Sequence, residues 1–444
     1  MNYFTIAYAT IIGFFTFFQL ILTGYSSSEL LLALNIFLLR FLFFYNINLS
    51  KSLISIMVLV FIDFSLILNP LFNFQFESIN ERKFIFSLGT ILQFIHIIIT
   101  IFFEILTKEK IEHISYFSSI SLNKINGFSS LYIISFFFSV FLNDQLNIFS
   151  LGGGSTVKLP FKLGSAIFYY QAVIAPFIFF IFLDMYFQKN EKNKIITLTF
   201  FYVILNIYSS FVMLSKGNFM FLAFYGTFWL VYRKIFGLKY LIVFTLPLIL
   251  VLSIYDSISI YRNIYGNFDL NNFRNVASIY TRDNSSIDIL KRMYDRLFKD
   301  GDMILKALNY NRGKVFFNNI ASVRNSGGPS KYHTFVIDGF PKTVQHSSGS
   351  SGFGGAFMIG GVSFCILTLI IISSFGNICD HKKLGYISKT VSGRTLISSF
   401  VLLMLIGGLW QYLMGRLLGI LVYPFIFYLH NILMKISTDL KAEV

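Results

Sequence analysis

Long apolar runs separated by short polar segments make up most of the chain. A helix that crosses the roughly 30 Å hydrocarbon core of a bilayer needs about 20 mostly apolar residues. The runs are continuous and lack the period-two alternation of membrane β-strands. The pattern therefore predicts an all-α, polytopic integral membrane protein of about 12 transmembrane helices. The predicted spans are 3–24, 29–48, 53–72, 84–106, 128–148, 164–188, 195–214, 218–232, 240–260, 353–375, 395–414 and 418–434.

Lysine and arginine predict the orientation of these spans, because short cytoplasmic loops carry an excess of both. With the N-terminus in the cytoplasm, sixteen Lys and Arg residues fall on the cytoplasmic side and six in short outer loops. The reversed orientation violates the rule by the same margin. We therefore expect both termini in the cytoplasm.

One hydrophilic segment, residues 261–352, is far longer than the other connections and follows the ninth span. It holds thirteen Lys and Arg against seven Asp and no Glu. The expected organisation is helices 1–9 in 1–260, a large periplasmic loop in 261–352, and helices 10–12 in 353–444. A loop of this length is usually functional, although its charge is also explained by attraction to anionic outer-leaflet headgroups.

Part of this loop is expected to form short amphipathic helices. Ser285 and Ser286 can cap a helix, and four apolar residues recur after them at helical spacing. Such a helix can lie on the membrane or cover the mouth of the bundle. The four apolar residues are Ile287, Leu290, Met293 and Leu297.

Composition supports the membrane interpretation and narrows the function. The chain is 55% hydrophobic and 13% charged, with a mean hydropathy of +0.68. These values exclude a disordered protein and a nucleic-acid-binding domain, and they argue strongly against a soluble enzyme. Much of the net charge of +15 follows from topology. No metal-binding or nucleotide-binding motif is present, so no cofactor is predicted.

Several charged or titratable residues fall inside or near the ends of predicted spans. Arg40 and Asp63 lie in adjacent spans, and a structural ion pair is the favoured interpretation because isolated intramembrane charges are costly. His96 is expected to be a hydrogen-bonded interior residue rather than a catalyst. Asp184 and Glu104 lie near cytoplasmic ends, where we expect them to snorkel.

Three cations mark the predicted outer ends of the bundle. Lys216 lies in the turn L-S-K-G-N, Arg262 directly follows the ninth span, and Arg416 lies between the last two spans. Helix starts at Asn218 and Leu418 would add N–H donors and a positive dipole end. Together these groups could bind one anion, although Lys216 is equally explained as a solvated turn cation.

Two local motifs and the overall layout resemble the Wzy-type O-antigen or oligosaccharide repeat-unit polymerases, which are related to the O-antigen ligase superfamily. S-K-G-N-F-M-F-L (215–222) is similar to the Ser-Arg-Gly turn of these families, with Lys216 where Arg is more usual. H-S-S-G-S-S-G-F-G-G-A-F-M-I-G-G (346–361) is similar to the end of their large loop. His346, Ser347 and Gly360 fit the ligase pattern, whereas Phe357 stands at a position where that pattern has Gly.

The resemblance implies a glycosyltransferase of the bacterial inner membrane that polymerises undecaprenyl-diphosphate-linked oligosaccharide repeat units at the periplasmic face. The product would be a lipopolysaccharide O-antigen or a capsule-type polysaccharide. A chain-length regulator and a flippase are implied as further partners, beside membrane lipid. The alternatives are a lipid-linked oligosaccharide flippase, an O-antigen ligase and a polysaccharide acyltransferase.

Within that interpretation, His346 is the predicted general base, because its unperturbed pKa lies near 6.5. His333, Asp338 and Asp288 remain alternatives. Cations should stabilise the charge that grows on the leaving diphosphate, and Arg suits bidentate phosphate contact better than Lys. The predicted diphosphate-binding residues are Lys216, Arg262, Arg274, Arg282 and Arg324.

Overall fold

In its described part, the computed structural model of the chain consists of helices and the segments that connect them, and contains no strand. The residues that it describes are 52–68, 79–106, 120–146, 163–213, 216–235, 271–276, 297–341, 351–381, 385–415 and 417–442, with single residues between them. They belong to two compact units. Unit 1 comprises 1–111, 294–384 and 400–421, and unit 2 comprises 112–293, 385–399 and 422–444.

Five helices within the described ranges are long and apolar enough to cross a membrane, which supports a multi-pass membrane protein. They are Asn80–Leu106, Leu122–Leu146, Ala166–Gln188, Lys192–Val212 and Gly352–Asp380. Shorter apolar helices occupy Leu53–Ile67, Val391–Gly407 and Leu421–Ile432. Each of these eight coincides with a predicted span. The predicted spans 3–24, 29–48 and 240–260 lie outside the described residues, so the total of twelve stays a prediction.

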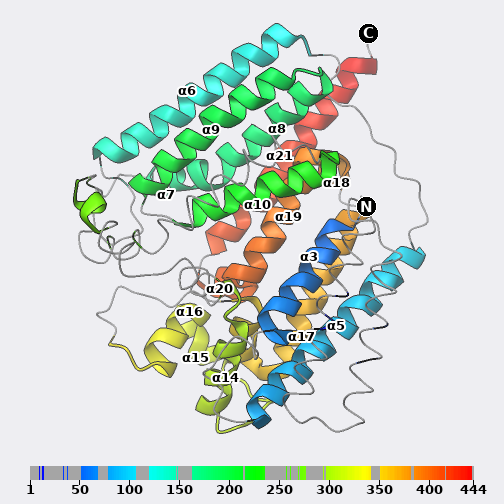
Figure 1. Cartoon of the computed structure of the whole chain (residues 1–444), viewed down its shortest axis with the longest axis vertical. Helices are drawn as coiled ribbons and strands as arrows, with labels where there is room; N and C mark the ends of the chain where they lie inside the picture. The colour runs from blue at the N-terminus through cyan, green and yellow to red at the C-terminus, as the bar shows by residue number, and fades with distance from the viewer. Residues whose placement is uncertain are drawn as a thin grey trace. The chain divides into compact units, whose positions relative to one another are not determined.

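Unit 1 is built around α17 (Gly352–Asp380), which packs against α3 (Leu53–Ile62), α5 (Ile79–Leu106) and α14 (Asp300–Tyr310) (Figure 1). The π-helical turn η1 (Asp63–Ile67) continues α3. The core contains large aliphatic and aromatic side chains together with buried polar ones such as His96 and Asn377. The large apolar side chains include Leu59, Phe61, Leu92, Phe353, Phe357 and Leu369.

The segment between the predicted ninth and tenth spans is folded where it is described. It forms α14, α15 (Ile320–Asn325), α16 (Pro329–Tyr332) and the π-helical turn η4 (His333–Ile337). α14 is amphipathic: Met303, Ile304 and Ala307 are buried, whereas Asn309 and Tyr310 are exposed. α14 is therefore a short amphipathic helix of the kind predicted for this segment. The helix expected to follow Ser285 and Ser286 falls mostly on residues outside the described ranges.

Unit 2 contains α6 (Leu122–Leu146), α8 (Ala175–Gln188), α9 (Lys192–Val212) and α10 (Lys216–Arg233). α7 (Leu163–Tyr169) and the π-helical turn η3 (Tyr170–Ile174) lead into α8. Helix α18 (Gly385–Lys389) and the first half of α19 (Val391–Gly407), as far as Ser399, also belong to this unit. α20 (Leu409–Gly415) lies in unit 1, and α21 (Leu417–Ala442) begins there and continues into unit 2.

Helix α6 shows how a lipid-facing helix differs from one in water. Tyr132, Phe136 and Val140 form its buried stripe at helical spacing. Its opposite face carries Leu131 and Phe138, which are 63% and 56% exposed. Large apolar side chains that stay exposed on so long a helix are favourable where the surrounding solvent is itself apolar.

Candidate functional site

The folded segment of unit 1 is attached to the first turn of α17 through the carboxylate of Asp300. The backbone N–H of Gly354 donates to Asp300 Oδ1 over 2.6 Å. A carboxylate at this position satisfies an N–H that the helix itself leaves without a partner and meets the positive end of the helix dipole. Asp300 is fully buried, and burial raises the pKa of its carboxyl group.

A second attachment lies at a break in α17. Gly360 and Gly361 have non-helical backbone angles, and Gly361 has φ +64°. The N–H of Asn319 donates to the carbonyl of Ile359 over 2.7 Å, and the N–H of Val362 donates to the carbonyl of Val315 over 3.1 Å. The non-helical segment before α15 thus supplies hydrogen bonds that the broken helix lacks, as irregular backbone within a membrane protein requires.

These attachments hold a cluster of titratable side chains on α14, η4 and the residue after η4. His333 Nδ1 lies 3.1 Å from Asp338 Oδ2. Lys306 Nζ lies 3.4 Å from Asp338 Oδ1 and 3.7 Å from Asp302 Oδ2. The side chain of His333 is 5% exposed and that of Lys306 is 41% exposed. The cluster therefore runs from the interior of unit 1 to its surface.

The π-helical turn explains why His333 and Asp338 meet. The N–H of Asp338 donates to the carbonyl of His333 over 2.9 Å, which is a bond between residues five apart. In a π turn such residues stack on one face, whereas in an α-helix they point in different directions. Both residues were predicted from the sequence as alternative bases, but nothing in the sequence indicated that they form a pair.

Neighbouring elements fix the position of η4. Gln411 Oε1 on α20 accepts a hydrogen bond from the N–H of Ser330 over 2.8 Å. Trp410 Nε1 on the same helix donates to Thr368 Oγ1 on α17 over 2.7 Å. Because α16 and η4 are continuous, these bonds also restrain the imidazole of His333.

Burial controls the protonation of this cluster. It lowers the pKa of His333 from its ordinary 6.5 to about 4, so the ring is neutral at pH 7. Burial also raises the pKa of Asp302. A neutral imidazole that donates Nδ1–H to Asp338 carries its basic lone pair on Nε2, and that atom is buried in this structure. This is the arrangement of a general base oriented by a carboxylate.

The structure accounts for only part of the predicted site. His346, Arg262, Arg282 and Asp288 lie outside the described residues. Lys216 is the first residue of α10, and its side chain is also outside them. Arg274 lies in the helical segment 271–276 of unit 2 and Arg324 in α15 of unit 1, and both are exposed. Their shared role as a diphosphate site stays a prediction.

A polar network inside unit 1 matches the expectation for His96. His96 Nδ1 lies 2.7 Å from Ser373 Oγ, and Nε2 lies 2.7 Å from the carbonyl oxygen of Ser55. The ring is fully buried, so His96 is confirmed as a hydrogen-bonded interior residue. Asp63 is also buried and accepts a hydrogen bond from the Gln93 amide. Its predicted partner Arg40 is outside the described residues.

The expectation for Asp184 was wrong. This carboxylate is 1% exposed rather than snorkelling. Its Oδ1 accepts from Trp229 Nε1 over 2.9 Å and from Arg233 Nη2 over 2.6 Å, while Oδ2 accepts from the N–H of Ser392 over 2.6 Å. Three donors compensate its desolvation. The sequence gave no sign of them because they come from α10 and α19.

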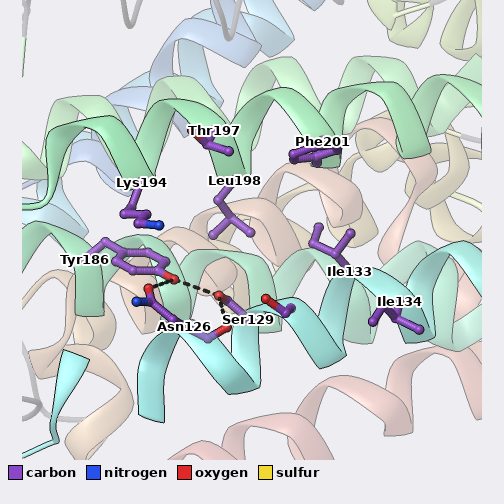
Figure 2. Close-up of a pocket in the computed structure, with 10 residues that line it drawn as sticks. Asn126, Ser129, Ile133, Ile134, Tyr186, Lys194, Thr197, Leu198 and Phe201 are labelled. Atoms are coloured by element: carbon purple, nitrogen blue, oxygen red, sulfur yellow. Dashed lines mark hydrogen bonds between the residues drawn. The ribbon is translucent and has the colours of Figure 1, made fainter. Parts of the chain in front are cut away.

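In unit 2, a pocket of about 260 Å³ lies between α6, α8 and α9 (Figure 2). Asn126, Ser129 and Tyr186 are joined by hydrogen bonds on one side of it. Ile134 and Phe201 are among the apolar residues that line it. Nothing in the sequence analysis had singled out these residues. Across the described parts of the chain, no group of three or more His, Cys, Asp or Glu could hold a metal ion.

No protein-family model matches this sequence, and neither a curated protein nor a solved structure matches it.

Proposed function

We propose that this chain is a glycosyltransferase of the bacterial inner membrane that polymerises undecaprenyl-diphosphate-linked oligosaccharide repeat units at its periplasmic face. The observation that carries the proposal is the pair of a buried His333 and a partly exposed Asp338, in a folded segment between predicted membrane spans. The layout and motifs that resemble the Wzy-type polymerases supply the substrate class. A lipid flippase would need neither a folded outer segment nor an oriented base.

The proposed reaction moves the growing chain from its lipid diphosphate to the terminal hydroxyl of a new lipid-linked repeat unit. The acceptor oxygen bonds to the anomeric carbon, and the bond between that carbon and the diphosphate oxygen breaks. The diphosphate leaves with the bonding electron pair. The hydroxyl proton passes to a general base, which contributes about 10²–10⁴-fold to such reactions.

His333 is the base that the described residues support. Its low pKa makes it neutral, and a bound diphosphate nearby would raise that pKa toward neutrality, because a negative charge favours the imidazolium. His346 remains the base that the sequence motif favours. His333→Gln and His346→Ala should be compared at equal protein level. The true base is the one whose loss lowers polymer formation by about 10²–10⁴.

Cations from the outer ends of the helices and the loop would stabilise the leaving diphosphate in this proposal. The candidates are Lys216, Arg262, Arg274, Arg282 and Arg324. Lys216→Ala should abolish polymer at normal protein level, and Lys216→Arg should retain it. If the Ala variant makes polymer of wild-type length, Lys216 is a solvated cation in a turn and does not bind the diphosphate.

Deletion of the gene, followed by gel analysis of surface polysaccharide, tests the function itself. Loss of a polymerase leaves a single repeat unit on the final acceptor. Loss of a ligase leaves bare acceptor while polymer accumulates on the lipid carrier, and loss of a flippase leaves neither. Either of the last two patterns would replace the proposed function.

A further inference from the structure

The pocket of unit 2 has a polar end and an apolar end. Asn126, Ser129, Tyr186 and Lys194 lie together at one end, and Ile134 and Phe201 lie at the other (Figure 2). From Asn126 to Ile134 the α6 axis rises about 12 Å, and from Lys194 to Phe201 the α9 axis rises about 10 Å, at 1.5 Å per residue. The two helices thus present the same change from polar to apolar over the same length.

The polar end is well suited to an anionic headgroup. Tyr186 Oη donates to Asn126 Oδ1 over 2.9 Å and lies 2.7 Å from Ser129 Oγ. Because Asn126 Oδ1 serves as the acceptor, its Nδ2 amide is the donor end of that side chain. Lys194 is exposed and reaches toward the Tyr186 ring (Figure 2). A cation and an amide donor beside one pocket are groups that bind phosphate oxygens.

The apolar end opens toward the surrounding lipid. Ile134 is 62% exposed and Phe201 is 49% exposed, and both lie in helices that are apolar enough to cross a membrane. Side chains exposed on such a face meet acyl chains rather than water. A ligand that occupies the whole pocket therefore has a charged head and a hydrocarbon tail.

We propose that the pocket between α6, α8 and α9 binds a membrane phospholipid with an anionic headgroup. The phosphate occupies the Lys194 end, and an acyl chain runs along Ile134 and Phe201. The predicted orientation places the starts of α6 and α9 in the cytoplasmic leaflet, where anionic lipids attract basic residues. None of the residues proposed for the transferase chemistry lines this pocket.

Native mass spectrometry of the purified full-length protein tests the proposal. The protein is titrated with phosphatidylglycerol or phosphatidylcholine, and bound lipid is counted. Phosphatidylglycerol should bind more tightly, and Lys194→Ala should weaken its binding by about fivefold, the effect of one cation at a membrane surface. Phe201→Ala should weaken the binding of both lipids, because it removes apolar contact with the acyl chain.

Lys192→Ala is the matched control. Lys192 is exposed on the same helix but is not a lining residue, and two residues correspond to about 200° around the helix. Its loss should change phosphatidylglycerol binding by less than about twofold. If Lys192→Ala and Lys194→Ala weaken phosphatidylglycerol binding equally, the effect comes from general surface charge, and the proposed site is wrong.

Inorganic phosphate separates a lipid site from a site for free anions. Phosphate lacks the tail, so millimolar phosphate should not displace phosphatidylglycerol. Displacement at such concentrations, or equal affinity for phosphatidylglycerol and phosphatidylcholine, would overturn the proposal. Melting temperatures of all variants should stay near the wild-type value, because the substituted side chains are exposed.

Discussion

At the residue scale, three carboxylates, two buried and one partly exposed, make contacts that connect parts of the described structure. Asp300 accepts from the first turn of α17, Asp184 accepts from three different groups, and Asp338 holds the imidazole of His333. Asp300 and Asp184 join elements that are distant in sequence, and Asp338 also contacts Lys306 on α14. Removing one should therefore affect more than the local turn.

The pH dependence of stability should reveal the burial of His333. Its pKa is about 4 in the folded protein and about 6.5 when unfolded, so the unfolded chain binds more protons between these values. The free energy of unfolding is then highest above pH 6.5 and falls as pH drops toward 4. Between pH 7 and pH 5 we expect a loss of about 2 kcal/mol.

His333→Gln should remove most of that pH dependence. The measurement is thermal unfolding of both proteins at pH 7 and pH 5, in the same detergent. If both lose the same stability on acidification, other groups are responsible and the imidazole of His333 is not held neutral by the fold.

Asp184→Ala should destabilise unit 2 strongly. The change leaves the Arg233 guanidinium, the Trp229 indole and a backbone N–H without the carboxylate, and breaking a buried ion pair costs about 3–5 kcal/mol. The melting temperature of the purified protein measures the effect. Glu191→Ala is the control, because this half-buried residue makes no side-chain cap at the start of α9 and its loss should be nearly neutral. Equal melting temperatures for the two variants would contradict the assigned role.

At the scale of elements, hydropathy predicted where helices occur but not how they end or break. The predicted span 128–148 corresponds to α6, which begins at Leu122 because the polar residues Asn123, Lys124 and Asn126 continue the helix. Hydropathy reports only the part that prefers the membrane interior. The helix itself extends beyond that part.

The break in α17 was hidden for the same reason. Gly360 and Gly361 lie within a continuous apolar stretch, so nothing in the pattern marks a boundary. What defines the break is the approach of Val315 and Asn319, about 40 residues earlier in the chain. Contacts of that separation cannot be read from local periodicity. The pairing of His333 with Asp338, which are only five residues apart, was missed for another reason: the hydrophobic pattern does not distinguish a π turn from an α turn.

Gly361→Ala should disrupt this break. Its φ of +64° is strained for any other residue, and an added Cβ would overlap the carbonyl oxygen of Val315. We expect a loss of at least about 1–3 kcal/mol, measured by thermal unfolding. Gly127→Ala is the control: its Cβ would meet no atom within 4 Å on α6, so the change should be neutral or stabilise by up to about 1 kcal/mol. An unchanged melting temperature for Gly361→Ala would show that the break is not tightly constrained.

At the scale of the whole molecule, topology is the property on which the site assignments depend. In the pocket of unit 2, the starts of α6 and α9 lie at one end, and Ile134 and Phe201, further along each helix, lie at the other. The two helices therefore run parallel. Two spans separated by one other should have this relation. Which end faces the cytoplasm rests on the distribution of Lys and Arg.

A reporter fusion after Asn311 tests the orientation. This residue follows α14 and lies within the segment predicted to be periplasmic. Alkaline phosphatase fused there should be active, because it matures only after export, and a cytoplasmic reporter at the same position should be silent. The opposite pattern would place 261–352 in the cytoplasm and remove the outer-face chemistry proposed for it.

The π-helical turns predict where the sequence of this protein should differ in length from those of its homologues. In the described helices, η1, η3 and η4 each hold a buried polar side chain: Asp63, Gln171 and His333. A π turn contains one residue more than the α turn that it replaces. A gene that loses one codon there would encode a regular helix in which later residues are rotated by about 100°. Sequence alignments should therefore place single-residue gaps at these turns, and those gaps would mark changes of chemistry rather than changes of loop length.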